Sequence, residues 1–419
     1  MRDVFIIGVG MTRFAKHFDL SVKDLAKEAL EATVADAGIP KEDIEAVWFS
    51  NSGWGGYSGQ TSIRGQVALR GAGIMGVPIT NVENACAGGA TALNGAWLGV
   101  KSGVYECTLA IGAEKMYQKD KTKTFQGFWG GTDVEAMQEY MAGFMKAAEA
   151  LRHVAPKEDS DLEGAGKNRS VFMDFYSLGA RAHIAQYGTT QEQLAIISSK
   201  NHFHSSLNPY AQFQKEMSVE EILAARTVSW PLTVPMCAPV GDGAAGAILC
   251  SSDYLKKLDS PRPVSILASI LGSSTDHSPG EWEKGISVRL SRQAYEKAGV
   301  GPADIDLAEV HDATAFGELS QTEALGFCGP GEGGTFAESG ATRLGGRLPI
   351  NTSGGLESRG HPIGASGLGM NHELVTQLRH EAGLRQVENC RLALAENGGG
   401  TLGIEEAAMG IHILERVEK

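Results

Sequence analysis

A cysteine stands where an apolar segment gives way to the glycine-rich start of a helix. Cys86 follows a strand-like stretch at residues 76–82, and small residues then open a helix expected over residues 87–100. A thiol at the amino end of a helix faces unpaired N–H groups and the positive end of the helix dipole. Both favour the thiolate, the nucleophilic form of cysteine. Cys86 is therefore a candidate nucleophile, with an inert buried thiol as the alternative for this residue taken alone.

A second candidate, His361, comes from an internal duplication of the chain. Residues 37–50 align without gaps with residues 298–311, and each copy follows an amphipathic helix that ends at a glycine. Residues 107–114 likewise match residues 390–397, and both read as buried strands.

A glycine-rich turn and a helix precede each strand of the second repeated pair. Cys86 lies in the first turn and His361 in the second. The pattern of each half therefore predicts the element order strand, helix, strand, turn, helix, strand, in a mostly parallel sheet covered by helices. Ligands bind such sheets beyond the carboxyl ends of the strands. We expect Cys86 and His361 to meet there, where the histidine can act as a general base.

The length and the duplication predict two structural units. The chain has 419 residues, which exceeds one ordinary domain. We expect an N-terminal half over residues 1–260 and a C-terminal half over residues 261–419. Residues from about 115 to 230 have no counterpart in the second half. They predict an inserted, mainly helical loop domain lying over the first half.

Composition excludes several function classes. The net charge of −13 argues against nucleic-acid binding, and no apolar run is long enough to span a membrane. The amino terminus reads as a strand and not as a signal peptide. The six cysteines form no Cys-x-x-Cys pair, so the sequence predicts no metal site and no disulfide framework. A cytoplasmic location fits best.

The motifs resemble those of the thiolase superfamily over essentially the whole chain. The segment at residues 351–367 contains Gly-His-Pro-Ile-Gly-Ala-Ser-Gly, and His311-Asp-Ala-Thr-Ala-Phe316 is similar to a motif of the sterol-carrier-protein type of thiolase. The resemblance extends to the benzoylsuccinyl-CoA-type thiolases and the lipid-transfer-protein aldolases. It implies an α/β thiolase fold, with two duplicated β-α-β halves in an α-β-α-β-α layering and an inserted loop domain.

The resemblance also implies an activity and a site. A thiolase cleaves a 3-oxoacyl-CoA with free CoA into two acyl-CoAs, through an acyl group held on Cys86. His361 would take the thiol proton, and His311 and His361 would line the oxyanion hole for the thioester oxygen. The backbone N–H of Cys86 and of a glycine in the run Gly398–Gly400, taken as Gly398, would line a second hole. Coenzyme A is then a co-substrate, and no bound cofactor is expected.

The chain departs from the family pattern at the second catalytic cysteine. Two places can hold that cysteine in the family, and this chain has Ala313 at one and Glu396 at the other. Glu396 or a histidine would then transfer the proton at C2, unless the leaving group needs little help. The departure favours a bulky or aryl-substituted substrate, such as a benzoylsuccinyl-type CoA thioester. Glu396 could equally be a structural residue.

Two other functions remain open, together with the assembly. One is a retro-aldolase acting on a 3-hydroxyacyl-CoA, and the other is a thiolase-like subunit without chemistry. The resemblance implies a homodimer, for which the apolar strand at residues 107–113 would supply an edge. It also implies a small partner subunit carrying an OB-fold and a zinc ribbon.

Overall fold

One nine-stranded sheet organises the molecule. The computed structural model describes residues 2–118, 123–124, 127–156 and 169–418. Within these residues the sheet order is β3-β2-β4-β7-β1-β8-β11-β10-β9. The first-half strands are β1 (Val4–Met11), β2 (Ala46–Ser50), β3 (Ile79–Val82), β4 (Cys107–Lys115) and β7 (Asp242–Ser251). The second-half strands are β8 (Val264–Ser273), β9 (Leu307–Glu309), β10 (Leu392–Gly399) and β11 (Ala408–Arg416).

The strand order reflects the duplication read from the sequence. Counted outward from the centre, β1, β7, β4 and β2 correspond to β8, β11, β10 and β9. The halves join where β1 pairs antiparallel with β8, through Phe5 with Ser265 and Ile6 with Val264. The two repeated units therefore share one continuous sheet.

The sheet is mixed, which corrects the prediction of a mostly parallel one. β2 pairs parallel with β3 and β4, and β9 with β10. β7 pairs antiparallel with both β1 and β4, and β11 with both β8 and β10. The repeated unit read from the sequence stops before β7 and β11. Each of these last strands returns into the middle of its half, which creates the antiparallel pairs.

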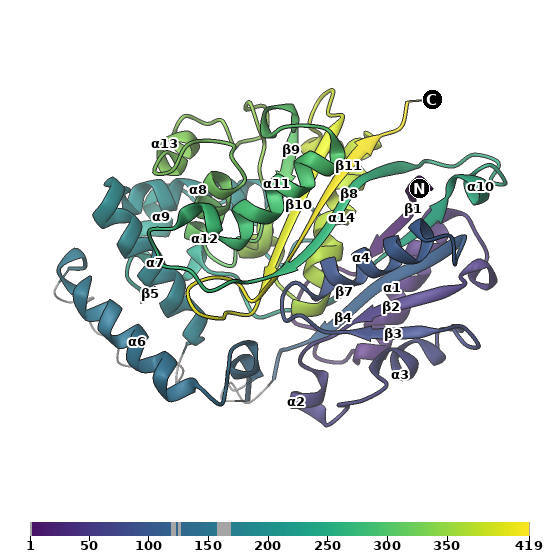
Figure 1. Ribbon diagram of the computed structural model, residues 1–419, viewed down its shortest axis with the longest axis horizontal. Coiled ribbons are helices and arrows are strands. Elements are labelled where there is room, and N and C mark those ends of the chain that lie inside the picture. Colours follow the sequence, from purple (N-terminus) through teal and green to yellow (C-terminus); the bar gives the residue numbers. More distant parts are fainter. Residues whose placement is uncertain (1, 119–122, 125–126, 157–168, 419) are drawn as a thin grey trace.

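Helices cover the sheet in the expected layers (Figure 1). α1 (Val22–Ala37) packs on β1, β7 and β4, and its counterpart α11 (Ile286–Ala298) packs on β8 and β11. Between the two parts of the sheet lie α4 (Gly88–Lys101) and α14 (Ile363–Leu378), which contact each other and strands of both halves. The order of layers is α-β-α-β-α, as expected from the sequence.

The two central helices cross at glycines. A Cβ atom placed on Gly89 of α4 would lie 2.8 Å from the Leu368 nitrogen of α14. One placed on Gly367 of α14 would lie 2.7 Å from the Ala90 nitrogen of α4. No side chain fits at either position, because the obstacle is backbone. The missing side chains let the amino ends of α4 and α14 approach each other, and with them the two candidate catalytic turns.

The segment between β4 and β7 is mainly helical where the structure describes it. It contains α6 (Met137–Ala150), α7 (Val171–Tyr187), α8 (Gln191–Ser206) and α9 (Val219–Leu223). α7 and α8 pack against α12 (Ala315–Ala324), and α8 also against α13 (Gly333–Glu338). These partners belong to the second half, so the expectation that the insertion lies over the first half is wrong for these helices. Their shared apolar cluster, which includes Leu194 and Leu319, explains the position.

The remaining elements are short. They are α2 (Trp54–Ser58), α3 (Arg64–Arg70), α10 (Ser252–Leu255), and the two-stranded ladder of β5 (Thr227–Ser229) and β6 (Leu232–Thr233). Among the described residues, no helix has both the length and the apolar character needed to cross a bilayer.

Candidate active site

Cys86 sits on a tight turn between β3 and α4. Ala85 has a φ of +47°, in the left-handed region, and the Ala87 nitrogen donates to the Asn84 carbonyl at 2.9 Å. The backbone of Gly399, at the end of β10, lies against this turn: a Cβ atom there would be 2.3 Å from the Ala87 nitrogen. The first-half cysteine turn is therefore held by a glycine run from the second half.

His361 meets Cys86 as the duplication predicted. Its Nε2 atom lies 3.2 Å from the Cys86 sulfur. On the other side of the ring, Nδ1 lies 2.7 Å from the Ser366 hydroxyl, and that hydroxyl donates to the Pro362 carbonyl at 3.0 Å. Because the hydroxyl proton is already used, Ser366 accepts from Nδ1–H. Nε2 therefore presents its lone pair to the Cys86 thiol.

His311 is held in the opposite tautomer. Its ring lies nearly perpendicular to that of His361, with 5.3 Å between the ring centroids. The Asn397 side-chain nitrogen lies 3.2 Å from His311 Nδ1 and donates to it. The proton of the neutral ring is thus on Nε2, which suits a hydrogen-bond donor in an oxyanion hole.

All three side chains are neutral at rest. Burial lowers the pKa of His311 to about 4, and burial together with the neighbouring His311 lowers that of His361 well below its usual value. Burial, then the charges of Glu83 and Glu114, raise the pKa of Cys86 to about 12. The expectation that the helix start favours a resting thiolate is therefore wrong, because desolvation of the sulfur outweighs the nearby N–H groups.

Glu396 is fully buried next to His311. One carboxylate oxygen accepts the His311 backbone N–H at 2.8 Å, while the other, Oε1, has no hydrogen-bond partner among the described residues. Burial, then the nearby carboxylate of Glu406, raise the pKa of Glu396 to about 8. At neutral pH this carboxyl group is mostly protonated and able to donate a proton.

Within the glycine run 398–400, Gly400 is the residue whose backbone acts on the Cys86 thiol. The backbone N–H groups of Cys86 and Gly400 act to lower the pKa of the Cys86 thiol. The Gly398 N–H is instead directed at the Glu396 carboxylate. Gly400 follows the last residue of β10 and has a φ of +65°, so the regular geometry of the strand does not continue through it, and the sequence run alone could not distinguish the glycines.

Glu114 joins the two halves beside the site. This buried carboxylate, at the end of β4, accepts the backbone N–H groups of Ser52 at 2.8 Å and of Gly364 at 3.2 Å. Ser52 follows β2 and Gly364 lies in the first turn of α14. Burial raises the pKa of Glu114 to about 7. This role was not predicted from the sequence, although a glutamate inside an apolar strand was a visible signal.

A buried polar network fixes the loop that carries His311. Asp312 accepts the Leu356 N–H at 2.6 Å and the Asn201 side chain of α8 at 3.1 Å. Lys200 is hydrogen-bonded to Glu318 of α12 and donates to the Ile350 carbonyl at 2.8 Å. These contacts tie the His-Asp loop to the segment before His361.

Three further residues near the site were not singled out from the sequence. They are Asn397, Glu406 and Tyr176 of α7. Burial, then Glu406 and Cys86, raise the pKa of Tyr176 well above its usual value. Glu406 accepts from Gln321 of α12 at 3.3 Å. Cys237 forms an isolated β-bridge with Thr314, and burial strongly raises the pKa of its thiol.

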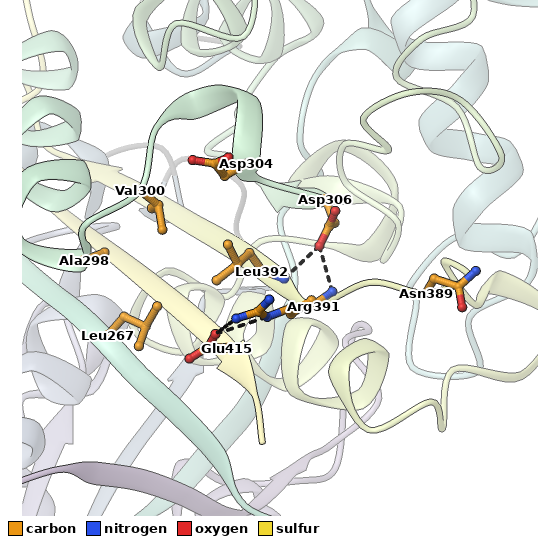
Figure 2. A pocket seen from close by; sticks show the side chains of 9 residues that line it. All are labelled: Leu267, Ala298, Val300, Asp304, Asp306, Asn389, Arg391, Leu392 and Glu415. Atoms are coloured by element: carbon orange, nitrogen blue, oxygen red, sulfur yellow. Dashed lines mark hydrogen bonds and ion pairs between the residues drawn. The ribbon is translucent and has the colours of Figure 1, made fainter. Parts of the chain in front are cut away.

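A pocket of about 570 Å³ lies elsewhere, at the amino end of β10 (Figure 2). Figure 2 shows Arg391 bonded to Glu415, while Asp306 accepts the backbone N–H groups of Arg391 and Leu392. Glu396 and Gly400 lie toward the opposite end of the same strand. The pocket is therefore separate from the cysteine and the histidines.

Comparisons with known proteins agree with this geometry. The "Thiolase, N-terminal domain" family matches residues 4–227, and "Thiolase C-terminal domain-like" matches residues 282–415. Acetyl-CoA acetyltransferase of Methanothermobacter thermautotrophicus is 37% identical over 99% of this chain and 100% of its own. Sterol carrier protein 2 of Gallus gallus is 38% identical, over 98% of this chain and 72% of its own.

One further relative and one solved structure are also similar to this chain. Benzoylsuccinyl-CoA thiolase subunit BbsB of Thauera aromatica is 32% identical, over 95% of this chain and of its own. The solved structure of the Ltp2-ChsH2(DUF35) aldolase has the same fold, with a TM-score of 0.79 at 23% identity, covering 100% of this chain and 98% of that one. With both family models matched in order and a relative aligned from end to end, the chain belongs to the thiolase family of acyltransferases.

Proposed function

We propose that this protein is a thiolase that cleaves a 3-oxoacyl-CoA with free CoA, through an acyl group on Cys86. The observation that carries the proposal is the pairing of His361 Nε2 with the Cys86 sulfur at 3.2 Å, in a tautomer that can accept the thiol proton. The intact Cys86, His311 and His361 disfavour a thiolase-like subunit without chemistry.

In the first step the thiol attacks the C3 carbonyl carbon while its proton moves to His361 Nε2. A neutral thiol–imidazole pair suits this order of steps, because charge then develops only as the sulfur–carbon bond forms. The C2–C3 bond breaks and leaves an acyl-Cys86 and the enolate of an acyl-CoA. In this proposal the N–H groups of Cys86 and Gly400 would stabilise the C3 oxygen, and His311 Nε2–H, the tautomer that Asn397 supports, would stabilise the enolate oxygen. Free CoA then takes the acyl group from the sulfur.

The proton that C2 requires would come from Glu396. The carboxyl group is buried beside His311, and burial raises its pKa to about 8. A protonated carboxylic acid can take the place of the missing second cysteine in the cleavage direction. Glu396 also accepts the His311 backbone N–H, so it helps to position the loop that carries His311.

We further propose a bulky or aryl-substituted acyl group, of the benzoylsuccinyl type. An aromatic cluster from α6, α7 and the turn Gly127–Gly131 lies beside the glycine run: it comprises Phe128, Phe144, Phe172 and Phe175. The Gly131 carbonyl accepts the Thr401 N–H at 2.8 Å, which joins this turn to the residue after Gly400. The BbsB relative supports an aryl substrate, whereas the acetyl-CoA acetyltransferase relative makes acetoacetyl-CoA the reference compound.

Mass spectrometry of the acylated enzyme tests the proposal. After incubation with 3-oxoacyl-CoAs, including a benzoylsuccinyl-type thioester and acetoacetyl-CoA, the acyl group should be found on the peptide containing Cys86. Cys86→Ser should abolish both the adduct and CoA-dependent cleavage, while the matched variant Cys328→Ser retains both. His361→Ala should slow acylation by about 10²–10⁴-fold. An acyl group on another cysteine, with activity retained in Cys86→Ser, would contradict the assignment.

A retro-aldolase is the second candidate, favoured by the fold shared with the Ltp2-ChsH2(DUF35) aldolase and by Tyr176 near the site. The raised pKa of Tyr176 keeps its phenol protonated at neutral pH, so it is a poor base there, which favours the thiolase. Product analysis separates the two activities. Thiolysis consumes free CoA and yields two acyl-CoAs, whereas retro-aldol cleavage releases an aldehyde or a ketone.

For the assembly we propose a homodimer with a small OB-fold and zinc-ribbon partner, in the cytoplasm. The name of the Ltp2-ChsH2(DUF35) aldolase contains a second component, and BbsB is named as a subunit. The expected dimer edge at residues 107–113 is wrong, because β4 is paired on both sides by β2 and β7. The open edge of the first half is β3.

A further inference from the structure

A thiol and two imidazoles converge in the active site. The ligand atoms of Cys86, His311 and His361 all lie within 4.8 Å of one another, and no other group of three or more possible metal ligands occurs among the described residues. Cysteine sulfur and histidine nitrogen are the ligands that zinc prefers. In a tetrahedral zinc site these atoms are about 3.3–3.6 Å apart, so the contact of 3.2 Å between Cys86 and His361 is already close to that spacing.

His361 is prepared for such a role by its surroundings. Its Nε2 lone pair faces the sulfur, and its Nδ1–H is held by Ser366. A histidine that binds a metal through one nitrogen and donates from the other to a fixed oxygen is the usual arrangement at metal centres.

His311 requires one change, and Asn397 can supply it. In the resting state Asn397 donates to Nδ1, so the proton is on Nε2. Asn397 is 1% exposed, and its own oxygen has no partner among the described residues. If the amide rotates by half a turn, this oxygen accepts from Nδ1–H, and Nε2 then carries the lone pair. The same asparagine can therefore support a hydrogen-bond donor or a metal ligand.

We propose that Cys86, His311 and His361 form a three-ligand site for Zn²⁺ or a similar borderline divalent metal ion, and that the bound ion reversibly switches the enzyme off. One metal–sulfur bond and two metal–nitrogen bonds form, the thiol proton is released to solvent, and water fills the fourth position. The ion occupies the nucleophile and the base together, so substrate attack and metal binding exclude each other. A three-ligand site with an open position allows the ion to exchange.

Cobalt spectroscopy tests the site without an activity assay. Co²⁺ added to the chelator-treated protein should give the strong visible bands of a tetrahedral ion and a thiolate charge-transfer band, and Zn²⁺ should remove them. The charge-transfer band or the tetrahedral pattern of visible bands should be lost in each ligand variant, namely Cys86→Ser, His311→Gln and His361→Gln. Both features should remain in the control variants Cys237→Ser and Cys328→Ser. Unchanged spectra in the three ligand variants would overturn the proposal, whatever reaction the enzyme catalyses.

The Asn397→Asp variant separates the two roles of His311. A carboxylate only accepts, so it should fix the proton on Nδ1 and the lone pair on Nε2. Metal affinity should then rise by about 10–100-fold, while substrate cleavage without metal falls. In the wild type, Zn²⁺ should inhibit turnover and protect Cys86 from iodoacetamide, and EDTA should reverse both effects. Weaker metal binding in a folded Asn397→Asp variant would refute the tautomer switch, and the ligand variants decide the site if that variant does not fold.

Discussion

At the scale of single residues, the site is a set of neutral groups whose protons are already assigned. Ser366 fixes the tautomer of His361, and Asn397 fixes that of His311. Burial holds both imidazoles and the Cys86 thiol in their uncharged forms. Reactivity therefore depends on proton transfer during attack and not on a thiolate that waits for substrate.

The resting state of Cys86 predicts how its alkylation varies with pH. With a pKa raised to about 12, the thiolate fraction is small at neutral pH and increases with pH. The iodoacetamide labelling rate of the Cys86 peptide should therefore rise by about tenfold for each pH unit between pH 6 and 9. Labelling in Cys86→Ser gives the background. Fast labelling that is independent of pH in this range would instead indicate a preformed thiolate–imidazolium pair.

Glu396 gives a second prediction at this scale. Glu396→Gln should lower turnover by about 10²-fold or more, with a smaller effect on acylation of Cys86 by a reactive thioester, because only the C2 step needs the acid. In the wild type, turnover in the cleavage direction should fall as pH rises through about 8, where the acid loses its proton.

Two variants control the Glu396 experiment. Glu406→Gln removes a neighbouring negative charge that raises the pKa of Glu396, so the alkaline decline in turnover should move to lower pH. Glu388→Gln changes an exposed carboxylate and should leave the pH dependence of turnover unchanged. If Glu396→Gln left turnover unchanged and the wild type turned over acetoacetyl-CoA quickly, Glu396 would be structural and the substrate would need no added activation.

At the scale of elements, the crossing of α4 and α14 positions Cys86 against His361. A Cβ atom on Gly89 would lie 2.8 Å from the Leu368 nitrogen and 2.9 Å from the Gly367 nitrogen, and backbone cannot move aside as a flexible side chain can. Gly89→Ala should destabilise the protein by about 1–3 kcal/mol and lower turnover, because the helices must separate. Chemical denaturation and steady-state kinetics measure both effects.

Gly143 of α6 is the matched control for the crossing. It is also a helical glycine, but a Cβ atom there would meet nothing within 4 Å. Gly143→Ala should leave activity unchanged and stabilise the protein by up to about 1 kcal/mol, since alanine is the better helix former. If both variants were equally stable and active, the close crossing would not be what holds the site together.

At the scale of the whole molecule, the open edge of β3 leads to a prediction about assembly. Met75 lies four residues before β3, and Ile63 immediately precedes α3, which contacts β3; these residues are 60% and 61% exposed. An unpaired strand flanked by exposed apolar residues is a suitable surface for pairing with a second copy. Light scattering should give a homodimer, and Met75→Glu should weaken it. Leu384→Glu, at an exposed position in the second half, should not. An active, monodisperse wild-type monomer would refute the dimer.

The sequence alone determined the duplicated architecture and the meeting of Cys86 with His361. Both follow from local patterns: the copies at residues 37–50 and 298–311, and two glycine-rich turns that open equivalent helices. Once the halves are related by symmetry, equivalent turns are forced together. The end of α1 at Gly38 was readable for the same reason, since it depends only on neighbours in the chain.

The tertiary structure decided what depends on burial and on remote partners. The direction of the Cys86 pKa shift comes from desolvation by both halves, which outweighs the local helix start. The approach of Gly399 to the cysteine turn, and the effect of the Gly400 backbone on the Cys86 thiol, depend on how the end of β10 meets the first half. Asn397 and Glu406 became visible only when β10 and the loop after it were placed beside His311. A linear pattern records which residues are present, whereas the pKa of a group and its hydrogen-bond partners are set by what the fold places around it.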